Sequence, residues 1–287
     1  MTVQFDNCPI LMKKNFLFIV CLILLLSGCA QPELNDKETF SGVSIQYNTS
    51  EIADCNYEFK LSEGNLYVKG QDFHNLLGEE EGALYDEWIR ITNESNIIHY
   101  EAVSGTVIYL TSDGCVYGFG NTEGGVLQTA ENTYYTTPVL LLNNCKYASL
   151  GVRFILFIKD DHTLWFLGES KNGQSTMVKE AISKPIQMID EKVQFAKAFG
   201  YTSAWIDENL DLYLCGDNSF GQIGNGQTGC GFPTMFQDIV TSPYLALSNC
   251  TAFNADSINK EVNAITVYVQ QYSWGGDFGP LPILQSE

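Results

Sequence analysis

The stretch Leu212-Tyr213-Leu214-Cys215-Gly216 decides the fold, because four further stretches repeat its pattern at intervals of about fifty residues. Each copy ends in an aromatic residue, two further residues and a glycine. The other copies are Leu66-Tyr67-Val68-Lys69-Gly70, Val116-Tyr117-Gly118-Phe119-Gly120, Leu164-Trp165-Phe166-Leu167-Gly168 and Gln271-Tyr272-Ser273-Trp274-Gly275. A repeat of this length indicates one supersecondary unit that is used several times.

The residues before each of these glycines predict a β-hairpin. In the second copy, Val107-Ile108-Tyr109-Leu110 leads through Thr111-Ser112-Asp113-Gly114 into Cys115-Val116-Tyr117, which is a strand, an Asp-Gly turn and a second strand. Residues 154–166 and 204–214 follow the same order. We therefore expect a series of small antiparallel sheets.

A polar bend and a proline follow each hairpin. Residues 168–174 and 216–224 are rich in glycine, which tolerates the positive φ angles of tight bends. Pro138 and Pro185 then open apolar segments that run to Leu142 and Ile189. Because proline has no backbone donor, we expect these segments to begin a strand or to lie at a sheet edge.

This order of hairpin, Gly-Gln bend and proline-led strand resembles the regulator of chromosome condensation repeat, whose units form the blades of a β-propeller. The best match is Asp217-Asn218-Ser219-Phe220-Gly221-Gln222-Ile223-Gly224, followed by Ser112-Asp113-Gly114-Cys115-Val116-Tyr117-Gly118-Phe119-Gly120. The resemblance implies an all-β fold, a β-propeller of about five recognisable blades over residues 45–287.

The chain departs from that family in three ways. The Gly-x-x-His segment that precedes the hairpin has no histidine in Gly151-Val152-Arg153-Phe154 or Gly200-Tyr201-Thr202-Ser203. Only five of the glycines that end the repeated stretches, which we call anchor glycines, are visible, whereas the family usually has seven blades. A closed ring, an open arc and a truncated chain are therefore all possible arrangements. The fifth copy, residues 264–279, has no clear turn residues between its strands.

The N-terminal residues predict export. Met12-Lys13-Lys14 is a basic start, residues 16–26 are an apolar run too short to span a bilayer, and Leu26-Ser27-Gly28-Cys29 follows. The last four residues resemble the bacterial lipoprotein box, which implies lipidation of Cys29 and cleavage before it. An ordinary signal peptide is the alternative.

We therefore expect three parts. Residues 1–28 are the signal peptide, with Met12 as the expected true start; residues 29–44 are the lipidated cysteine and a polar tether; residues 45–287 are the propeller. This organisation predicts a bacterial cell-envelope protein that is lipid-anchored and extracytoplasmic, with its lipid as its only link to the membrane.

The charge of the chain argues against nucleic acid. Its 15 basic and 34 acidic residues give a net charge of −19. A surface this acidic repels phosphate backbones and anionic lipid headgroups. The chromatin role of the family's namesake is therefore a poor guide to this chain.

The cysteines leave two interpretations open. Six lie after Cys29, namely Cys55, Cys115, Cys145, Cys215, Cys230 and Cys250. An even number in an exported domain permits disulfides, whereas buried cysteines also serve as small apolar residues. Cys145 and Cys250 occupy similar places in different repeats, which would separate them in a propeller.

No catalytic or metal motif stands out in the sequence. His74, His99 and His162 are the only histidines, and none lies three or four residues from another. Gly-x-Ser-x-Gly and Walker-type loops are absent. We therefore expect no metal and no cofactor. The sequence favours a protein that is not an enzyme. A catalytic pair of carboxylates like that of glycosidases is not excluded, but nothing in the sequence singles out two carboxylates for that role.

The aromatic residues divide into two groups. Those three residues before the anchor glycines, Tyr67, Tyr117, Trp165, Tyr213 and Tyr272, are expected to pack between blades, with a ligand-binding ring as the alternative. Loop residues outside the repeated strands are the candidate partner contacts: Tyr134, Tyr135, Asp217, Asn218, Phe220 and Phe232.

Two functions follow from these observations. The favoured one is a lipid-anchored protein-binding or scaffold module that presents a propeller face to an unknown extracytoplasmic protein. The alternative is an envelope enzyme or glycan-binding protein that acts on cell-wall or host polysaccharide. Two carboxylates about 5–10 Å apart beside exposed aromatic residues would favour the alternative.

Overall fold

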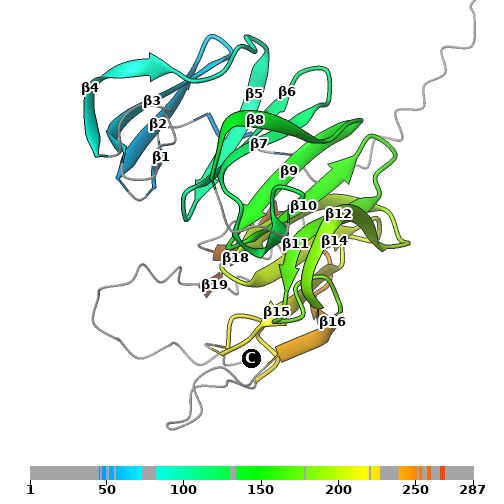
Figure 1. Cartoon of the computed structure of the whole chain (residues 1–287). Coiled ribbons are helices and arrows are strands. Elements are labelled where there is room, and N and C mark those ends of the chain that lie inside the picture. The colour runs from blue at the N-terminus through cyan, green and yellow to red at the C-terminus, as the bar shows by residue number, and fades with distance from the viewer. Residues whose placement is uncertain are drawn as a thin grey trace, which may run out of the picture. The chain divides into compact units, whose positions relative to one another are not determined.

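The structure of the chain is a computed structural model. It describes residues 45, 47–49, 52–54, 56–72, 82–129, 134–177, 179–219, 221–226, 239–250, 252–253, 257–259 and 266–268. All of them lie in the compact unit Gly42–Glu287, and their strands form five antiparallel sheets, which we number as blades 1 to 5 in chain order (Figure 1). No helix within these residues is both long and apolar enough to cross a membrane.

The bounds of the strands follow the repeats. Blade 1 contains β1 (Ile52–Asp54), β2 (Tyr57–Ser62), β3 (Asn65–Asp72) and β4 (Ala83–Arg90). Blade 2 contains β5 (Ile97–Val103), β6 (Thr106–Thr111), β7 (Val116–Asn121) and β8 (Tyr134–Leu142), with the short 3₁₀ turn η1 (Glu123–Gly125) before β8. Blade 3 contains β9 (Cys145–Gly151), β10 (Phe154–Lys159), β11 (Leu164–Ser170) and β12 (Lys179–Ile189). Blade 4 contains β13 (Val193–Phe199), β14 (Thr202–Asp207), β15 (Leu212–Asp217) and β16 (Ile239–Leu247). Blade 5 contains β17 (Ala252–Phe253), β18 (Ser257–Asn259) and β19 (Thr266–Tyr268).

The blades pack through their first strands. Within each blade the strands lie side by side in chain order. β1 contacts β5, β5 contacts β9 and β9 contacts β13, so the first strands are the inner ones and the fourth strands are the outer edges (Figure 1). Burial agrees, because five of the seven residues of the first strand β5 are buried whereas no residue of the fourth strand β16 is. The prediction of an all-β propeller is confirmed.

The repeated hairpins are confirmed in blades 2, 3 and 4, and the anchor glycines have the backbone that the bend requires. The φ angles are 127° at Gly70, 93° at Gly120, 117° at Gly168 and 115° at Gly216. At Gly216 an added Cβ would also lie 2.4 Å from the carbonyl oxygen of Tyr201 on the neighbouring hairpin. Gly275 of the fifth copy lies outside the described residues.

The prolines lie in edge strands, as expected, but they do not begin them. β8 starts at Tyr134 and β12 at Lys179, so Pro138 and Pro185 lie within the outermost strand of their blades. Pro243 has the corresponding place in β16. An outer strand can hold proline because the missing N–H faces no further strand. These prolines also interrupt the edge along which another sheet could pair.

The repeated aromatic residues are half-buried, and Tyr117, Trp165 and Tyr213 pack against the apolar cores between blades, as expected. Tyr117 stacks on Tyr109 with ring centroids 5.3 Å apart, and Tyr213 stacks on Trp205 at 5.9 Å. The fully enclosed ring is the partner on the second strand, because Tyr109 is 0% and Trp205 is 2% exposed. Trp165 is half-buried too, with the Lys159 ammonium 5.0 Å from its ring centroid. Tyr272 lies outside the described residues.

The outward face of blade 1 departs from the apolar packing between the other blades. In blade 2 the three positions that face blade 1 are buried and apolar: Val107, Tyr109 and Phe119. Blade 1 carries Glu58, Lys60 and Lys69 at the same register positions. Lys69 Nζ lies 2.8 Å from Glu58 Oε2, and both ammonium groups lie within 5 Å of the Trp88 ring, at 4.2 Å for Lys60 and 4.9 Å for Lys69. This face is therefore charged where its counterparts are apolar.

The described cysteines that the structure assigns are free thiols. Cys115 is half-buried, and Cys145, Cys215 and Cys250 are buried. Burial raises the pKa of Cys145 and of Cys215 to about 12, so both thiols are unreactive near neutral pH. The backbone N–H groups of Cys145 and Cys250 each donate to the hairpin turn of the preceding blade, which confirms that the two occupy equivalent places. Cys55 and Cys230 lie outside the described residues.

The first prediction tests the anchor glycine against a glycine in open space. Gly224 also has a positive φ, of 76°, but an added Cβ there would meet nothing within 4 Å. Gly216→Ala should therefore lower the free energy of unfolding by about 1–3 kcal/mol more than Gly224→Ala. Both substitutions place alanine at a positive φ, but only the one at Gly216 also brings the new methyl group against the Tyr201 carbonyl oxygen. Urea denaturation of both variants measures the difference. Equal losses would show that the approach of Gly216 to Tyr201 is unimportant.

The second prediction separates the two aromatic positions of the hairpin. Trp205→Ala empties a fully enclosed site and should destabilise the domain by about 3–5 kcal/mol. Trp165→Ala should cost clearly less, because part of that ring already contacts water. Thermal unfolding of the two variants at the same pH gives the comparison, and a larger loss for Trp165→Ala would contradict it.

Candidate functional site

Three polar residues occupy one register position on the inner strands of successive blades. They are Glu101 on β5, Ser149 on β9 and Lys197 on β13, and each lies opposite the corresponding residue of its blade's second strand. Ser149 follows Glu101 by 48 residues and Lys197 follows it by 96. The repeat therefore brings an acid, a hydroxyl and a base together from three blades.

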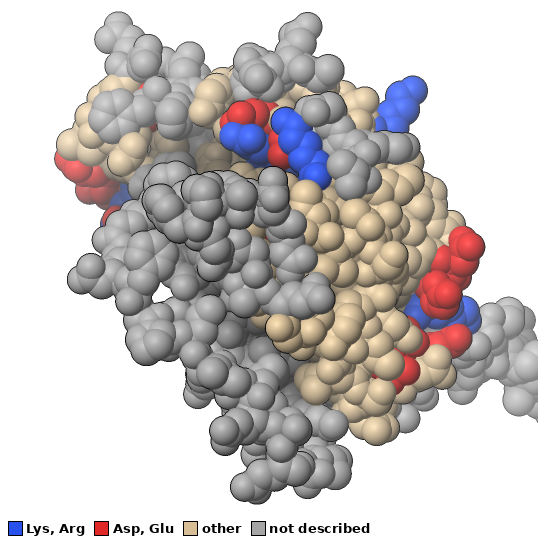
Figure 2. Space-filling model, turned by 90° about the horizontal axis from the view of Figure 1, so that it is seen from below, with Lys and Arg blue, Asp and Glu red and all other residues tan. Residues whose placement is uncertain are grey.

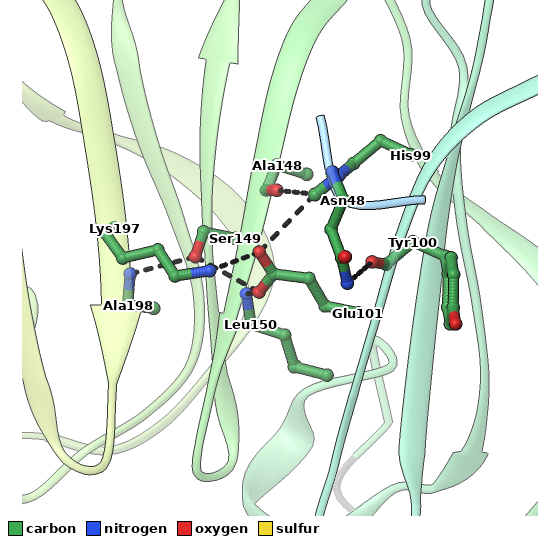
Figure 3. Close-up of polar contacts among 9 residues, drawn as sticks. All are labelled: Asn48, His99, Tyr100, Glu101, Ala148, Ser149, Leu150, Lys197 and Ala198. Atoms are coloured by element: carbon green, nitrogen blue, oxygen red, sulfur yellow. Dashed lines mark hydrogen bonds and ion pairs between the residues drawn. The ribbon is translucent and has the colours of Figure 1, made fainter. Parts of the chain in front are cut away.

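Their side chains form one hydrogen-bonded network between blades 2, 3 and 4 (Figure 3). Lys197 Nζ lies 2.5 Å from Glu101 Oε1. The other carboxylate oxygen, Oε2, accepts from the Leu150 N–H at 2.7 Å and from the Ser149 hydroxyl at 3.2 Å. Ser149 Oγ accepts in turn from the Ala198 N–H at 3.0 Å. The carboxylate thus joins the inner strands of all three blades.

His99 lies two residues before Glu101 on the same face of β5. Its Nδ1 lies 2.7 Å from the backbone nitrogen of Asn48, and its Nε2 lies 2.9 Å from the carbonyl oxygen of Ala148 on β9. Nε2 is also 3.5 Å from Glu101 Oε1. The ring is 1% exposed, so blade 2, blade 3 and the segment before β1 meet at this histidine (Figure 3).

The position of His99 also repeats as a row of rings. Tyr147 of β9 and Phe195 of β13 occupy the same register position in blades 3 and 4. The ring centroids are 5.0 Å apart for His99 and Tyr147, and 5.3 Å apart for Tyr147 and Phe195. The inner strands therefore carry an aromatic row beside the polar one.

The electrostatics of the network keep Glu101 ionised. Burial alone would raise the pKa of Glu101, but the Lys197 ammonium and the hydrogen bond with His99 outweigh burial and lower that pKa to about 2. A carboxylate with four polar neighbours and 5% exposure holds the strands together. Its oxygens are already engaged by these neighbours, so the geometry favours an architectural role.

The structure corrects the expectation that Asp217 and Asn218 are exposed contact residues. Asp217 is 8% exposed, and its Oδ1 accepts from the backbone N–H of Ser219 at 3.0 Å. Its Oδ2 accepts from Gln222 Nε2 at 3.1 Å. Asn218 is 0% exposed and accepts from the Ile223 N–H at 2.9 Å. Both side chains shape the bend from within, because its turned backbone leaves N–H groups that need acceptors.

Of the other predicted contact residues, the structure describes only Tyr134 and Tyr135. Tyr134 and Tyr135 lie on the edge strand β8, and not in a loop as expected. Tyr134 is 36% exposed, whereas Tyr135 packs against the core between blades 2 and 3. Cys29, Phe220 and Phe232 lie outside the described residues.

The outer strands expose apolar side chains that the sequence analysis did not single out. Leu140 of β8 lies opposite Tyr117, and Leu245 of β16 lies opposite Tyr213 at the same register position. They are 49% and 46% exposed. Blade 3 has Gln187 at this position. Further exposed apolar residues on the outer strands are Leu84, Ile239 and Tyr244, in addition to the predicted contact residue Tyr134.

Both missed features had a signal in the sequence. Each exposed leucine stands two residues after the proline of its outer strand, in Pro138-Val139-Leu140 and Pro243-Tyr244-Leu245. The inner network can be recognised in the sequence only when residues 101, 149 and 197 are aligned by the 48-residue spacing of their strands. An acid, a hydroxyl and a base at one repeat position would then have indicated a contact between blades.

The carboxylates that the structure describes include one converging pair outside the network. Glu123 Oε1 lies 2.6 Å from Arg153 Nη2, and Glu169 Oε2 lies 3.6 Å from Arg153 Nη1. Both acids therefore converge on a guanidinium group that pairs with their charges. Over the described ranges, no group of three His, Cys, Asp or Glu residues is placed to hold a metal ion.

The third prediction concerns acid stability. The pKa of Glu101 lies at about 2 in the folded protein against an ordinary value of 4.5, so its contribution to stability is complete above pH 4.5 and is lost as the pH falls toward 2. A shift of this size corresponds to about 3 kcal/mol. Urea denaturation from pH 7 to pH 2 should show this loss in the wild type, and Glu101→Gln should lack that part of the pH dependence. Parallel curves for the two proteins would contradict it.

Comparisons with known proteins agree on the fold. No family model matches the sequence, and no curated protein matches it. Among solved structures, human WBSCR16 superposes with a TM-score of 0.53 at 15% identity, over 66% of this chain and 49% of that one. Prp20p from Saccharomyces cerevisiae gives 0.53 at 19% identity, over 62% and 46%. Yeast RCC1 (Prp20), solved with Kap60 bound, gives 0.55 at 15% identity, over 72% and 50%.

The chain therefore spans about half the length of these structures. At such identities the likeness concerns architecture alone. The sequence resemblance to the regulator of chromosome condensation repeat is confirmed at this level, and the chain has the fold of the RCC1-repeat β-propellers.

Proposed function

We propose that this chain is a lipid-anchored, extracytoplasmic β-propeller that binds a protein partner through its outer strands. The observation that carries the proposal is the pair of exposed leucines, Leu140 and Leu245, at one register position on the outer strands of blades 2 and 4. Large apolar side chains held on rigid strands gain free energy when a partner covers them.

The surface around blade 4 supports this choice. Figure 2 views the chain from the side on which β15 and β16 lie in Figure 1, and the part of this face that belongs to described residues includes a continuous area without Lys, Arg, Asp or Glu, with charged side chains along its edges. A contact area with few charges in its middle and polar groups at its rim is the composition found in protein interfaces. Ile239 and Tyr244 are further exposed apolar residues of β16, although Tyr244 points to the face of the strand opposite to Leu245.

The fold is also used by proteins that bind other proteins. Yeast RCC1 (Prp20) was solved in complex with Kap60, and the Prp20p structure was described together with its binding to Gsp1p and histones. These partners belong to those proteins. For this chain we propose a protein partner in the cell envelope, because the net charge of −19 disfavours nucleic acid and the N-terminal sequence resembles a lipoprotein signal.

The fourth prediction tests the outer strands. Leu140→Lys and Leu245→Lys should each change the free energy of unfolding by less than about 0.5 kcal/mol, since both side chains are largely exposed. The double variant should lose a partner that the wild-type protein captures by cross-linking on intact cells. Gln187→Lys is the matched control, because it adds the same charge at the same register position in blade 3 and should keep the partner. Capture that survives the double variant would overturn the proposed surface.

The fifth prediction tests the anchor. The wild-type protein should partition into the detergent phase, because lipid on Cys29 would hold it there. Cys29→Ser should remove the lipid and leave the chain incorrectly processed. Metabolic labelling with a fatty-acid analogue, followed by detergent-phase partition, measures both effects. An unlabelled wild-type protein would refute the anchor without affecting the proposed binding surface.

A further inference from the structure

The segment before β1 lies across the inner strands like a strap, which we define as the described residues Ile45, Tyr47, Asn48 and Thr49. Tyr47 Oη donates to the carbonyl oxygen of Lys146 on β9 at 3.1 Å, and Ile45 packs against the core between blades 3 and 4. On β5 the strap is held through Asn48, whose carbonyl oxygen accepts from the Tyr100 N–H at 3.3 Å. The strap therefore contacts blades 2, 3 and 4.

The geometry fixes the protonation state in which His99 can hold this strap. A backbone N–H can only donate, so the Asn48 nitrogen at 2.7 Å requires an unprotonated Nδ1. A backbone carbonyl can only accept, so the Ala148 oxygen at 2.9 Å requires a proton on Nε2. The neutral ring with its proton on Nε2 satisfies both neighbours (Figure 3). In the opposite tautomer, Nδ1–H would face the Asn48 N–H, and the unprotonated Nε2 would face the Ala148 carbonyl oxygen.

A second proton on His99 can only go to Nδ1, where it removes the bond between this ring and the strap. Nδ1 is the unprotonated nitrogen of the neutral ring, and once protonated it faces the Asn48 N–H as one donor against another. The cationic ring gains a partner at the same moment, because Nε2 lies 3.5 Å from the Glu101 carboxylate. Protonation thus exchanges a hydrogen bond to the strap for an ion pair within blade 2.

Three ionisable groups near His99 keep one charge state between pH 8 and pH 5. Glu101 stays ionised, because its pKa lies at about 2. Tyr147 on β9 and Tyr47 on the strap stay neutral, because burial raises the pKa of each phenol. Lys197 on β13 is the remaining charge, and it is paired with Glu101.

Lys146 is the one neighbour of the strap that needs a separate control. Burial lowers its pKa to about 8, and its Nζ lies 2.9 Å from both ring nitrogens of His162. Its contact with the strap runs through its backbone carbonyl, which does not titrate.

We propose that His99 is a pH latch for the strap. The neutral ring accepts the Asn48 N–H of the strap, and a second proton at Nδ1 breaks this bond and loosens the strap, which keeps its bonds to Tyr100 and Lys146. The latch is independent of the proposed partner and of the lipid, because it depends only on contacts among described residues of the strap, β5 and β9.

Hydrogen exchange of the full chain in detergent tests the latch, since the Asn48 N–H is itself the donor of the bond. Exchange rates of the strap amides are measured by mass spectrometry from pH 8 to pH 5 and corrected for their intrinsic pH dependence. In the wild type the corrected protection should fall by about tenfold per pH unit below the titration, as one bound proton requires. Core amides of β9 should keep their protection over the same range.

Three variants separate the latch from its surroundings. His99→Phe places in blade 2 the ring that blade 4 has at this position, Phe195, and should make strap protection independent of pH. Lys146→Met and Asn48→Ala keep His99 and the Asn48 N–H, and both should keep the wild-type pH dependence. Should His99→Phe fail to fold, nitrogen NMR of the wild-type ring must still show an unprotonated Nδ1 at neutral pH whose protonation coincides with loss of strap protection. Protection that is independent of pH in the wild type, or a pH dependence that persists in His99→Phe, would overturn the proposal.

Discussion

The buried carboxylate of Glu101 is the constraint on which the arrangement of blades 2, 3 and 4 depends. A charge with 5% exposure is tolerated only where charged and polar partners surround it. Its partners come from β9 and β13, in two other blades. Apolar packing alone would allow small shifts of one blade against the next. Hydrogen bonds and ion pairs are directional, so these contacts fix one relative position of the three blades.

The repeat keeps the backbone and varies the side chains that meet. Glu101, Ser149 and Lys197 share one register position, yet their chemistry differs. Glu101 and Ser149 each accept a hydrogen bond from the next blade, whereas Lys197 pairs with Glu101 two blades before it. The row of His99, Tyr147 and Phe195 follows the same principle with rings. A propeller built from identical copies would place three like groups at each position, and three buried acids could not be accommodated there.

The hairpins and bends could be predicted from sequence because they are local. An Asp-Gly turn and a glycine such as Gly216 report the backbone of their own few residues. The inner network could not be predicted in the same way, since its partners lie 48 or 96 residues apart and meet only after the blades pack. Asp217 and Asn218 were misjudged because polar residues in a glycine-rich stretch suggest exposure, whereas here they satisfy the backbone of a buried bend. Tyr134 resembles a loop residue in sequence because it lies outside the repeated hairpin pattern, whereas β8 begins at this residue.

The charged outward face of blade 1 sets a boundary to the stacking of blades. A further blade, whether from this chain or from another copy, would have to strip water from Lys60 and from the Glu58–Lys69 pair without offering the apolar contact that joins blades 1 and 2. Solenoid proteins end their stacks with polar terminal repeats for the same reason. The charged side chains of this face of blade 1 therefore disfavour filament growth by the stacking of further copies on it.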